Sequence, residues 1–202
     1  MPAHPHHLGF TLARARRGAA TFARPQRIAA AIAIAALLAV AITCIAAPQL
    51  SPSHKTIVLV RHAEKDTTVA GSDPPLSAAG RLRADELARL IGDTPLHAIY
   101  STPYQRTRQT VTPLAARAGD SLTVIQDVKT TLAALRSEPW GSTVLVVGHS
   151  NSVPQLYIGL TGLAFPDSDR VANDGIWVVT LARDGTSSLL RLHYGAPAAF
   201  VR

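Results

Sequence analysis

Three short apolar runs in this chain each stop abruptly at polar side chains. Each run is rich in Val, Ile and Leu and is too short for a typical helix, so each predicts a strand buried on both faces of a sheet. The runs, each with the residues that follow it, are 57–60 (Arg61-His62), 96–100 (Ser101-Thr102) and 143–147 (Gly148-His149).

Helical segments are predicted between these strands. Ser77 is a suitable N-cap for a helix that ends near residue 91. Spacing places the apolar face of this helix at Leu82, Leu87, Leu90 and Ile91. Further helices are expected from Pro103 to residue 118, where Pro113 predicts a kink or an early end, and over 128–135 and 152–160.

Strands that alternate with helices predict an α/β fold, here a three-layer sandwich with a mostly parallel sheet. A short strand is also expected at 122–125. Two more runs, 176–181 and 189–193, flank Asp184-Gly185 and predict a hairpin. Residues 55–202 therefore form one domain of ordinary size.

The segment before this domain has a different composition. Residues 28–47 are uncharged and apolar, which predicts a single transmembrane helix, although a cleaved signal peptide stays open. Residues 1–27 are basic and expected to be disordered, and residues 48–54 read as a linker. The flanking arginines place the N-terminus in the cytoplasm and the domain outside it, at the cell membrane. Cleavage would make the domain secreted or periplasmic.

Charge and cysteine content exclude some functions. The net charge is +7, but five arginines precede residue 28, and the remainder carries only +2. The domain also lacks interleaved basic and aromatic residues, so we expect no nucleic-acid binding. Cys44 is the single cysteine, which excludes an intrachain disulfide and a cysteine metal site. The sequence predicts no oligomeric state.

The polar residues after the strands predict one shared pocket. Carboxyl ends of parallel strands lie at one edge of a sheet, where α/β proteins bind ligands. Arg61, His62, Arg106 and His149 would meet there. Two arginines and two histidines suit a phosphoryl group, whose oxygens favour bidentate, charge-assisted donors. A neutral imidazole is a competent nucleophile, and a second can share in charge neutralisation.

Four blocks support this interpretation: LVRHAEK, PLSAAGR, YSTPYQRTRQT and VVGHSN, in this order. Together they resemble the histidine phosphatase superfamily, also called phosphoglycerate mutase-like, in its short bacterial-type branch. The resemblance implies that His62 becomes phosphorylated, that Arg61 and Arg106 bind phosphate, and that His149 is the second pocket histidine. It implies a structural helix start at Ser77 and Gly80, and no metal or other cofactor.

This chain departs from the family pattern in places. Ala63 replaces a frequent glycine, and no room exists for the lid insertion of the sugar-phosphate mutases, which argues against a mutase. The usual general acid lies between the arginine block and the second histidine, where the chain offers only Asp120, Asp127 and Glu138. Glu64 is a possible substitute. The alternative for Glu64 and Asp127 is a solvated surface carboxylate.

The sequence therefore predicts a metal-independent phosphatase that forms a phosphohistidine and acts on a phosphorylated small molecule or phosphoprotein. Two other functions stay open. Gly148-His149-Ser150 resembles a nucleophile elbow, which would make Ser150 the nucleophile of a serine hydrolase. Its acid and base would be Asp167, Asp169 or Asp174 with His193. The other alternative is a catalytically silent, membrane-anchored phosphate-binding module.

Overall fold

A computed structural model describes residue 33 and residues 51–119, 122–166 and 171–197. The helices are α2 (Ala78–Ile91), α3 (Gln105–Ala118), α4 (Val128–Ser137) and α5 (Ser152–Thr161). The strands are β1 (His54–Arg61), β2 (Ala98–Ser101), β3 (Leu122–Val124), β4 (Thr143–Gly148), β5 (Gly175–Ala182) and β6 (Ser187–His193). Strands and helices alternate as the sequence predicts, and His54 belongs to β1 rather than to a linker.

The strands form one mixed sheet in the order β3-β2-β4-β1-β5-β6. The first four strands in this order are parallel to one another, and β5 and β6 form the predicted antiparallel hairpin at one edge. The α/β class is therefore confirmed, with parallel pairing confined to β3, β2, β4 and β1. In this arrangement β1 and β4 lie at the centre of the sheet.

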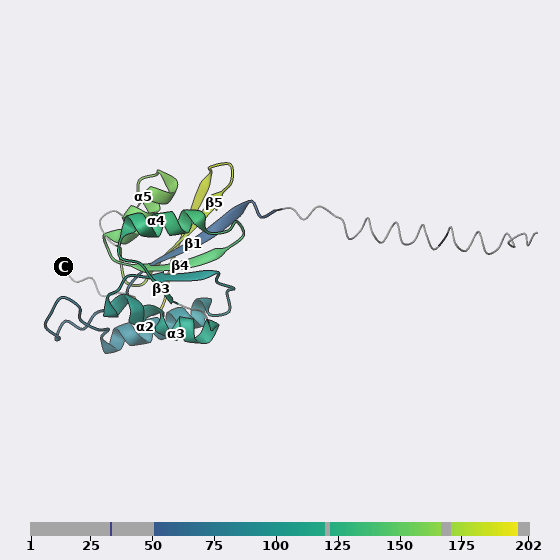
Figure 1. The fold of residues 1–202 in the computed structure, drawn as a ribbon. Helices are drawn as coiled ribbons and strands as arrows, with labels where there is room; N and C mark the ends of the chain where they lie inside the picture. Colours follow the sequence, from purple (N-terminus) through teal and green to yellow (C-terminus); the bar gives the residue numbers. More distant parts are fainter. Residues whose placement is uncertain (1–32, 34–50, 120–121, 167–170, 198–202) are drawn as a thin grey trace, which may run out of the picture. The chain divides into compact units, whose positions relative to one another are not determined.

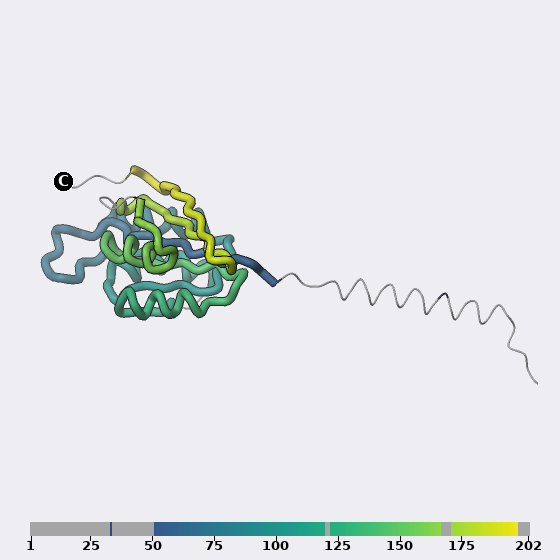
Figure 2. The backbone as a smooth tube through the Cα atoms, turned by 90° about the horizontal axis from the view of Figure 1, so that it is seen from above, coloured from purple at the N-terminus to yellow at the C-terminus, as the bar shows by residue number. Residues whose placement is uncertain are grey.

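Helices cover both faces of the sheet, α4 and α5 on one side and α2 and α3 on the other (Figure 1). Figure 2 shows the course of the same backbone from above. Strand β1 shows why both faces must be covered. Ile57 and Leu59 pack toward α4 and α5, whereas Val58 and Val60 pack toward α2 and α3. A strand buried on both sides requires apolar residues at consecutive positions, as the sequence has.

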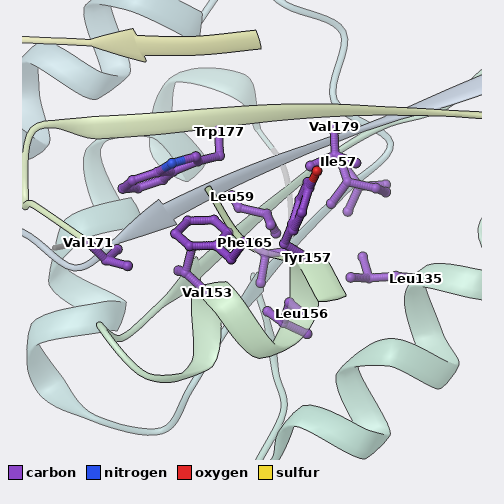
Figure 3. Packing of buried hydrophobic residues seen from close by; sticks show 12 residues of the cluster. Ile57, Leu59, Leu135, Val153, Leu156, Tyr157, Phe165, Val171, Trp177 and Val179 are labelled. Carbon is purple, nitrogen blue, oxygen red and sulfur yellow. The ribbon is translucent and has the colours of Figure 1, made fainter. Parts of the chain in front are cut away.

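Aromatic side chains fill much of the core under α5. Phe165 lies between Tyr157 and Trp177, with ring centroids 5.5 and 5.7 Å away (Figure 3). These rings pack against Ile57 and Leu59 of β1. Tilted and edge-to-face contacts of this kind contribute beyond area burial. The core thus fixes the central strands whose ends carry the predicted site residues.

Helix α2 begins as predicted, because the Ser77 hydroxyl accepts a hydrogen bond from Gly80 N at 3.1 Å. Its predicted apolar face is only partly correct, since Leu82 and Leu90 are exposed. The buried positions include Arg83 and Leu87. The helix is rotated relative to the prediction because Arg83 has polar partners inside the fold.

Helix α3 does not end early at Pro113, but continues to Ala118 and closes at Gly119. Gly119 has a φ of 69°, a conformation that glycine adopts without a Cβ penalty. No helix among the described residues is long and apolar enough to cross a membrane. Apart from residue 33, the predicted tail and transmembrane or signal segment lie outside the described residues.

Candidate active site

The carboxyl ends of β1, β2 and β4 meet at one edge of the sheet. Arg61 pairs with Gly148, and Ser101 pairs with Val147 one residue earlier on β4. A cavity of about 760 Å³ opens at this edge. All four predicted residues line this cavity: Arg61, His62, Arg106 and His149. Their side chains are therefore brought together as the strand-end argument predicts.

His62 is buried, and its backbone contacts hold it rigidly. Its N–H donates to Gly148 O at 2.9 Å, and its carbonyl accepts from Asn173 Nδ2 at 2.5 Å. Ring atom Nδ1 lies 2.7 Å from the carbonyl oxygen of Ala63. Because a carbonyl only accepts, Nδ1 must carry the proton, and the Nε2 lone pair is left free. Burial, with the nearby Arg61, His149 and Arg106, lowers the His62 pKa to about 3, so the ring is neutral at pH 7.

His149 faces His62 across the site, with ring centroids 5.3 Å apart and planes at 65°. Its backbone N–H donates to Ser152 Oγ at 2.8 Å, and its ring Nε2 lies 2.9 Å from Thr102 Oγ1. Tyr104 contacts the same ring edge-to-face. Burial, followed by Arg106 and Arg61, lowers the His149 pKa to about 4, so this imidazole is neutral as well.

The Arg61 guanidinium makes a hydrogen bond through Nη1 but none through Nε. Nη1 donates to Val171 O at 2.8 Å, whereas Nε is buried without a hydrogen-bond partner. Burial lowers the Arg61 pKa, while Glu64 acts in the opposite direction. An unpaired buried N–H is costly, and an anion in the cavity would supply the missing acceptor.

Arg106 lies in the first turn of α3, where the loop before α2 contacts it. Nη1 lies 3.5 Å from both Asp73 Oδ1 and Ser72 O. The guanidinium stacks over the Tyr104 ring at 4.3 Å. These long contacts orient the guanidinium without using all of its donors, so Arg106 remains able to bind an anion.

The backbone after His62 is clamped by α2 and α3. Ala63 N donates to Thr110 Oγ1 at 2.9 Å, and Ser77 N donates to Glu64 O at 2.9 Å. A Cβ at Gly80 would lie 2.2 Å from Glu64 O, so only glycine permits this approach. The clamp holds the Ala63 carbonyl, which in turn fixes the His62 ring.

Glu64 does not line the cavity. Its carboxylate accepts three hydrogen bonds from Arg83 at 2.6–3.0 Å. Arg83 also donates to Tyr194 O at 2.8 Å. Glu64 therefore joins β1 to α2 and to the segment after β6, and the structure gives no support to its predicted role as general acid.

The other predicted acids are no better placed. Asp127 is exposed at the cavity edge, where it caps α4 by accepting from Thr130 N and Oγ1, and these bonds lower its pKa. Glu138 is buried away from the cavity, where it accepts a hydrogen bond from the Tyr100 hydroxyl. Asp120 lies outside the described residues. Among the described residues that line the cavity, Asp127 is the one carboxylate.

Ser150 is exposed and lines the same cavity, but the structure does not complete a serine triad around it. His193 Nδ1 lies 3.5 Å from Asp174 Oδ1, and neither residue lines the cavity that Ser150 lines. Asp167 and Asp169 lie outside the described residues. No described residue except glycine has a positive φ, so Ser150 lacks the strained backbone of a nucleophile elbow.

Asp73 and Thr107 did not emerge from the sequence, and Thr102 emerged only as a polar residue after a strand, without its contact to His149. Each acts through a contact that is distant in sequence or that depends on the exact turn before α3. No cluster of three or more metal-ligating side chains occurs among the described residues. The site thus combines two cations with two neutral imidazoles, which suits nucleophilic attack on a bound phosphoryl group.

Comparisons with known proteins relate part of the sequence to a known family. Residues 57–129 match the family model of the histidine phosphatase superfamily (branch 1). No curated protein matches the chain. The matched residues include Arg61, His62 and Arg106 and end before β4 and His149.

Solved structures share the fold. The protein histidine phosphatase SixA complexed with tungstate superposes with a TM-score of 0.57 at 21% identity, over 68% of this chain and 96% of that one. The putative phosphohistidine phosphatase SixA from Nakamurella multipartitia gives 0.51 at 27% identity, over 72% and 99%. A mycobacterial glucosyl-3-phosphoglycerate phosphatase gives 0.57 at 17% identity, over 67% and 97%.

Proposed function

Because the chain belongs to the histidine phosphatase superfamily, we propose that it is a metal-independent phosphatase that works through a phosphohistidine on His62. One observation carries this proposal. The Ala63 carbonyl fixes the proton of His62 on Nδ1 and leaves the Nε2 lone pair free, beside Arg61, Arg106 and His149. A nucleophile needs this combination of a neutral ring and an available lone pair.

The reaction has two steps. In the first, His62 Nε2 attacks phosphorus in line, the bond between phosphorus and the carrier breaks, and the carrier leaves with the electron pair. In the second, water attacks the phosphohistidine and the P–N bond breaks. Arg61 and Arg106 hold the phosphoryl oxygens in both steps and stabilise the charge that develops on them.

The cavity also suggests a substrate class. Its one described carboxylate, Asp127, is held ionised by two hydrogen bonds and has no proton to donate. We therefore propose substrates whose leaving group needs no protein acid, namely N-phosphoryl compounds such as phosphohistidine, and aryl or acyl phosphates. The neighbour from Nakamurella, at 27% identity, is named as a putative phosphohistidine phosphatase, which agrees with this class.

Phosphate release by the full-length protein tests the proposal, measured in EDTA against phosphoramidate, p-nitrophenyl phosphate and an alkyl phosphate. We expect fast release from the first two and at least tenfold slower release from the third. His62→Gln should abolish release and prevent trapping of a labelled phosphoenzyme, whereas Ser150→Ala should keep both.

Each alternative function has its own outcome in this experiment. Ester hydrolysis that depends on Ser150 and not on His62 would support the serine hydrolase. Vanadate binding without release from any substrate would support the silent binding module. Release that is lost in EDTA and restored by a divalent metal would contradict the metal-free mechanism.

We also propose that residues 28–47 anchor the chain in the cell membrane, with the phosphatase domain outside the cytoplasm. This rests on the apolar sequence of the segment and the arginines before it. Membrane fractionation with protease treatment of intact cells tests it. A full-length protein that stays in the cytosolic fraction contradicts the proposal, and a shortened, secreted or periplasmic protein supports signal cleavage instead.

A further inference from the structure

Two threonine hydroxyls connect His149 to the backbone at the start of α3. Thr102 Oγ1 lies 2.9 Å from His149 Nε2 and 2.8 Å from Thr107 Oγ1. Thr107 is fully buried, and its hydroxyl lies 3.0 Å from the carbonyl oxygen of Thr102 and 2.8 Å from that of Tyr104. Two backbone carbonyl oxygens lie at one end of this chain of hydrogen bonds. Because they can only accept, they determine which atom is the donor in each of the other bonds.

A carbonyl oxygen accepts hydrogen bonds and cannot donate them, so the single hydroxyl proton of Thr107 points toward a carbonyl. If this proton pointed toward Thr102 Oγ1 instead, the lone pairs of Thr107 Oγ1 would face those of both carbonyl oxygens, at 3.0 and 2.8 Å. Thr107 Oγ1 therefore accepts from Thr102, which uses the single proton of Thr102. Thr102 Oγ1 then offers His149 only a lone pair, and His149 Nε2 must be the donor.

A neutral imidazole with its proton on Nε2 has its lone pair on Nδ1. His149 Nδ1 makes no hydrogen bond to a described residue and is not among the buried unpaired atoms, and the ring lines the cavity. Burial, followed by the charges of Arg106 and Arg61, disfavours protonation of the ring. The open nitrogen of His149 is thus an acceptor before substrate binds.

We propose that Thr102 and Thr107 are positioning residues that hold His149 with its Nδ1 lone pair toward the cavity, so that His149 acts as a proton acceptor. This rests on the proposed phosphatase function. During hydrolysis of the phosphohistidine, the attacking water gives a proton to His149 Nδ1 as its oxygen bonds to phosphorus. The P–N bond breaks, its electron pair returns to His62 Nε2, and phosphate leaves. His149 then releases the proton to solvent.

This role differs from the charge neutralisation expected from the sequence. A protonated His149 would donate to the phosphoryl group from the start, whereas the neutral ring accepts a proton first and becomes a cation only as charge develops. Arg61 and Arg106 then bear the initial charge of the bound group. The difference is measurable, because the two roles require different protonation of the same nitrogen.

Ring ¹⁵N NMR of the full-length protein without phosphate, at pH 7, measures this protonation directly. The His149 signals are assigned by their loss in His149→Gln. We expect protonated Nε2 and bare Nδ1 in the wild type and in Thr102→Ser, and a mixture of tautomers in Thr102→Val. Protonated Nδ1 in the wild type overturns the proposal. An unchanged tautomer in Thr102→Val overturns the positioning role.

Kinetics give a second, independent measurement. Thr102→Val and Thr107→Val should lower kcat about ten- to a hundredfold with little change in KM, by analogy with losing the partner that orients a metal-ligating histidine. Thr107→Ser should restore most of kcat. Thr112→Val is the matched control, since Thr112 makes the same kind of bond, to Arg108 O, on the exposed side of α3.

An equal loss of kcat in the Thr112 control, or a loss confined to KM, contradicts the positioning role. The NMR experiment needs no turnover. A wild-type protein that hydrolyses no phosphoryl substrate therefore refutes the proposed function, while the tautomer is still decided separately.

Discussion

At the residue scale, the backbone alone orients the candidate nucleophile. In a Ser-His-Asp triad a carboxylate holds the histidine, whereas here the Ala63 carbonyl performs that task for His62. A carbonyl fixes the tautomer without adding negative charge. Burial and the neighbouring cations keep the ring neutral, because together they outweigh the Ala63 hydrogen bond, which by itself raises the His62 pKa.

This environment predicts the ionisation of both site histidines. The pKa values of about 3 for His62 and about 4 for His149 lie well below the ordinary 6.5. Neither ring should take up a proton when the pH of the phosphate-free protein is lowered from 7 to 5. Ring NMR titration, with signals assigned through His62→Gln and His149→Gln, measures this. A midpoint near 6.5 for either ring would show that the site is more solvated than the structure implies.

Glu64 is the residue for which sequence reasoning and structure differ most. Its position two residues after His62 suggests catalysis, but its partner Arg83 follows 19 positions later and fixes it outside the cavity. We expect Glu64→Gln to keep kcat within about fivefold and to lower stability, because Arg83 loses its charged partner. A loss of kcat of a hundredfold or more in a folded variant would restore the role of general acid.

At the element scale, α2 shows what a sequence pattern can and cannot predict. Its start at Ser77 and its end near residue 91 follow from local capping chemistry, and both are confirmed. Which face of α2 is buried depends on contacts that are distant in sequence. Leu82 is 68% exposed and Arg83 only 6%, because Arg83 finds Glu64 and the Tyr194 carbonyl, which are distant in sequence. Apolar spacing alone cannot reveal a buried cation with such partners.

Arg83 should therefore contribute more to stability than an ordinary surface arginine. Arg83→Met leaves Glu64 and the Tyr194 carbonyl without their donor, and we expect a loss of about 2–4 kcal/mol in unfolding free energy. Arg89→Met on the same helix is the control, since Arg89 pairs with Glu86 at the exposed surface. It should cost about 0.5 kcal/mol or less. Urea unfolding measures both, and equal losses would show that the buried pair has no special role.

Gly80 tests the clamp between α2 and the nucleophile loop. Gly80→Ala places a methyl group 2.2 Å from Glu64 O, so α2 or the loop must shift. We expect a loss of about 1–3 kcal/mol, as for other overpacked sites, together with lower kcat because the Ala63 carbonyl moves. The exposed neighbour provides the control, and Ala79→Ser should change neither quantity appreciably. An unchanged kcat in Gly80→Ala would show that the clamp does not control the orientation of the His62 ring.

At the scale of the whole molecule, the order of the strands in the sheet determines which strand-end residues lie next to one another. The sequence predicts that Arg61, Ser101 and Gly148 each follow a strand, and parallel pairing brings such ends to one edge. It does not predict that β4 lies between β1 and β2, which places His149 beside both arginines. That order is a property of the whole sheet, since long-range pairing and not local pattern selects it.

The same site makes the stability of the molecule depend on pH. Both histidines have lower pKa values folded than the ordinary 6.5, so the unfolded chain binds more protons below pH 6.5, and stability falls as pH falls. The loss continues until the folded rings themselves protonate near pH 4 and 3. Between pH 7 and 5 the buried His62 costs about 2 kcal/mol, a large share of a typical 5–15 kcal/mol, and the partly exposed His149 costs less because solvent screens it.

Denaturant unfolding of full-length protein at pH 7, 6 and 5 measures this dependence. The wild type should lose several kcal/mol more than His62→Gln/His149→Gln, because the double variant has no neutral ring to protonate on unfolding. All other histidines and carboxylates remain in both proteins, so the difference isolates the site. Phosphate should reduce the loss in the wild type alone, since a bound anion offsets the arginines that keep His149 neutral. Parallel pH profiles for the two proteins would contradict the burial of two neutral imidazoles in one cation-rich site.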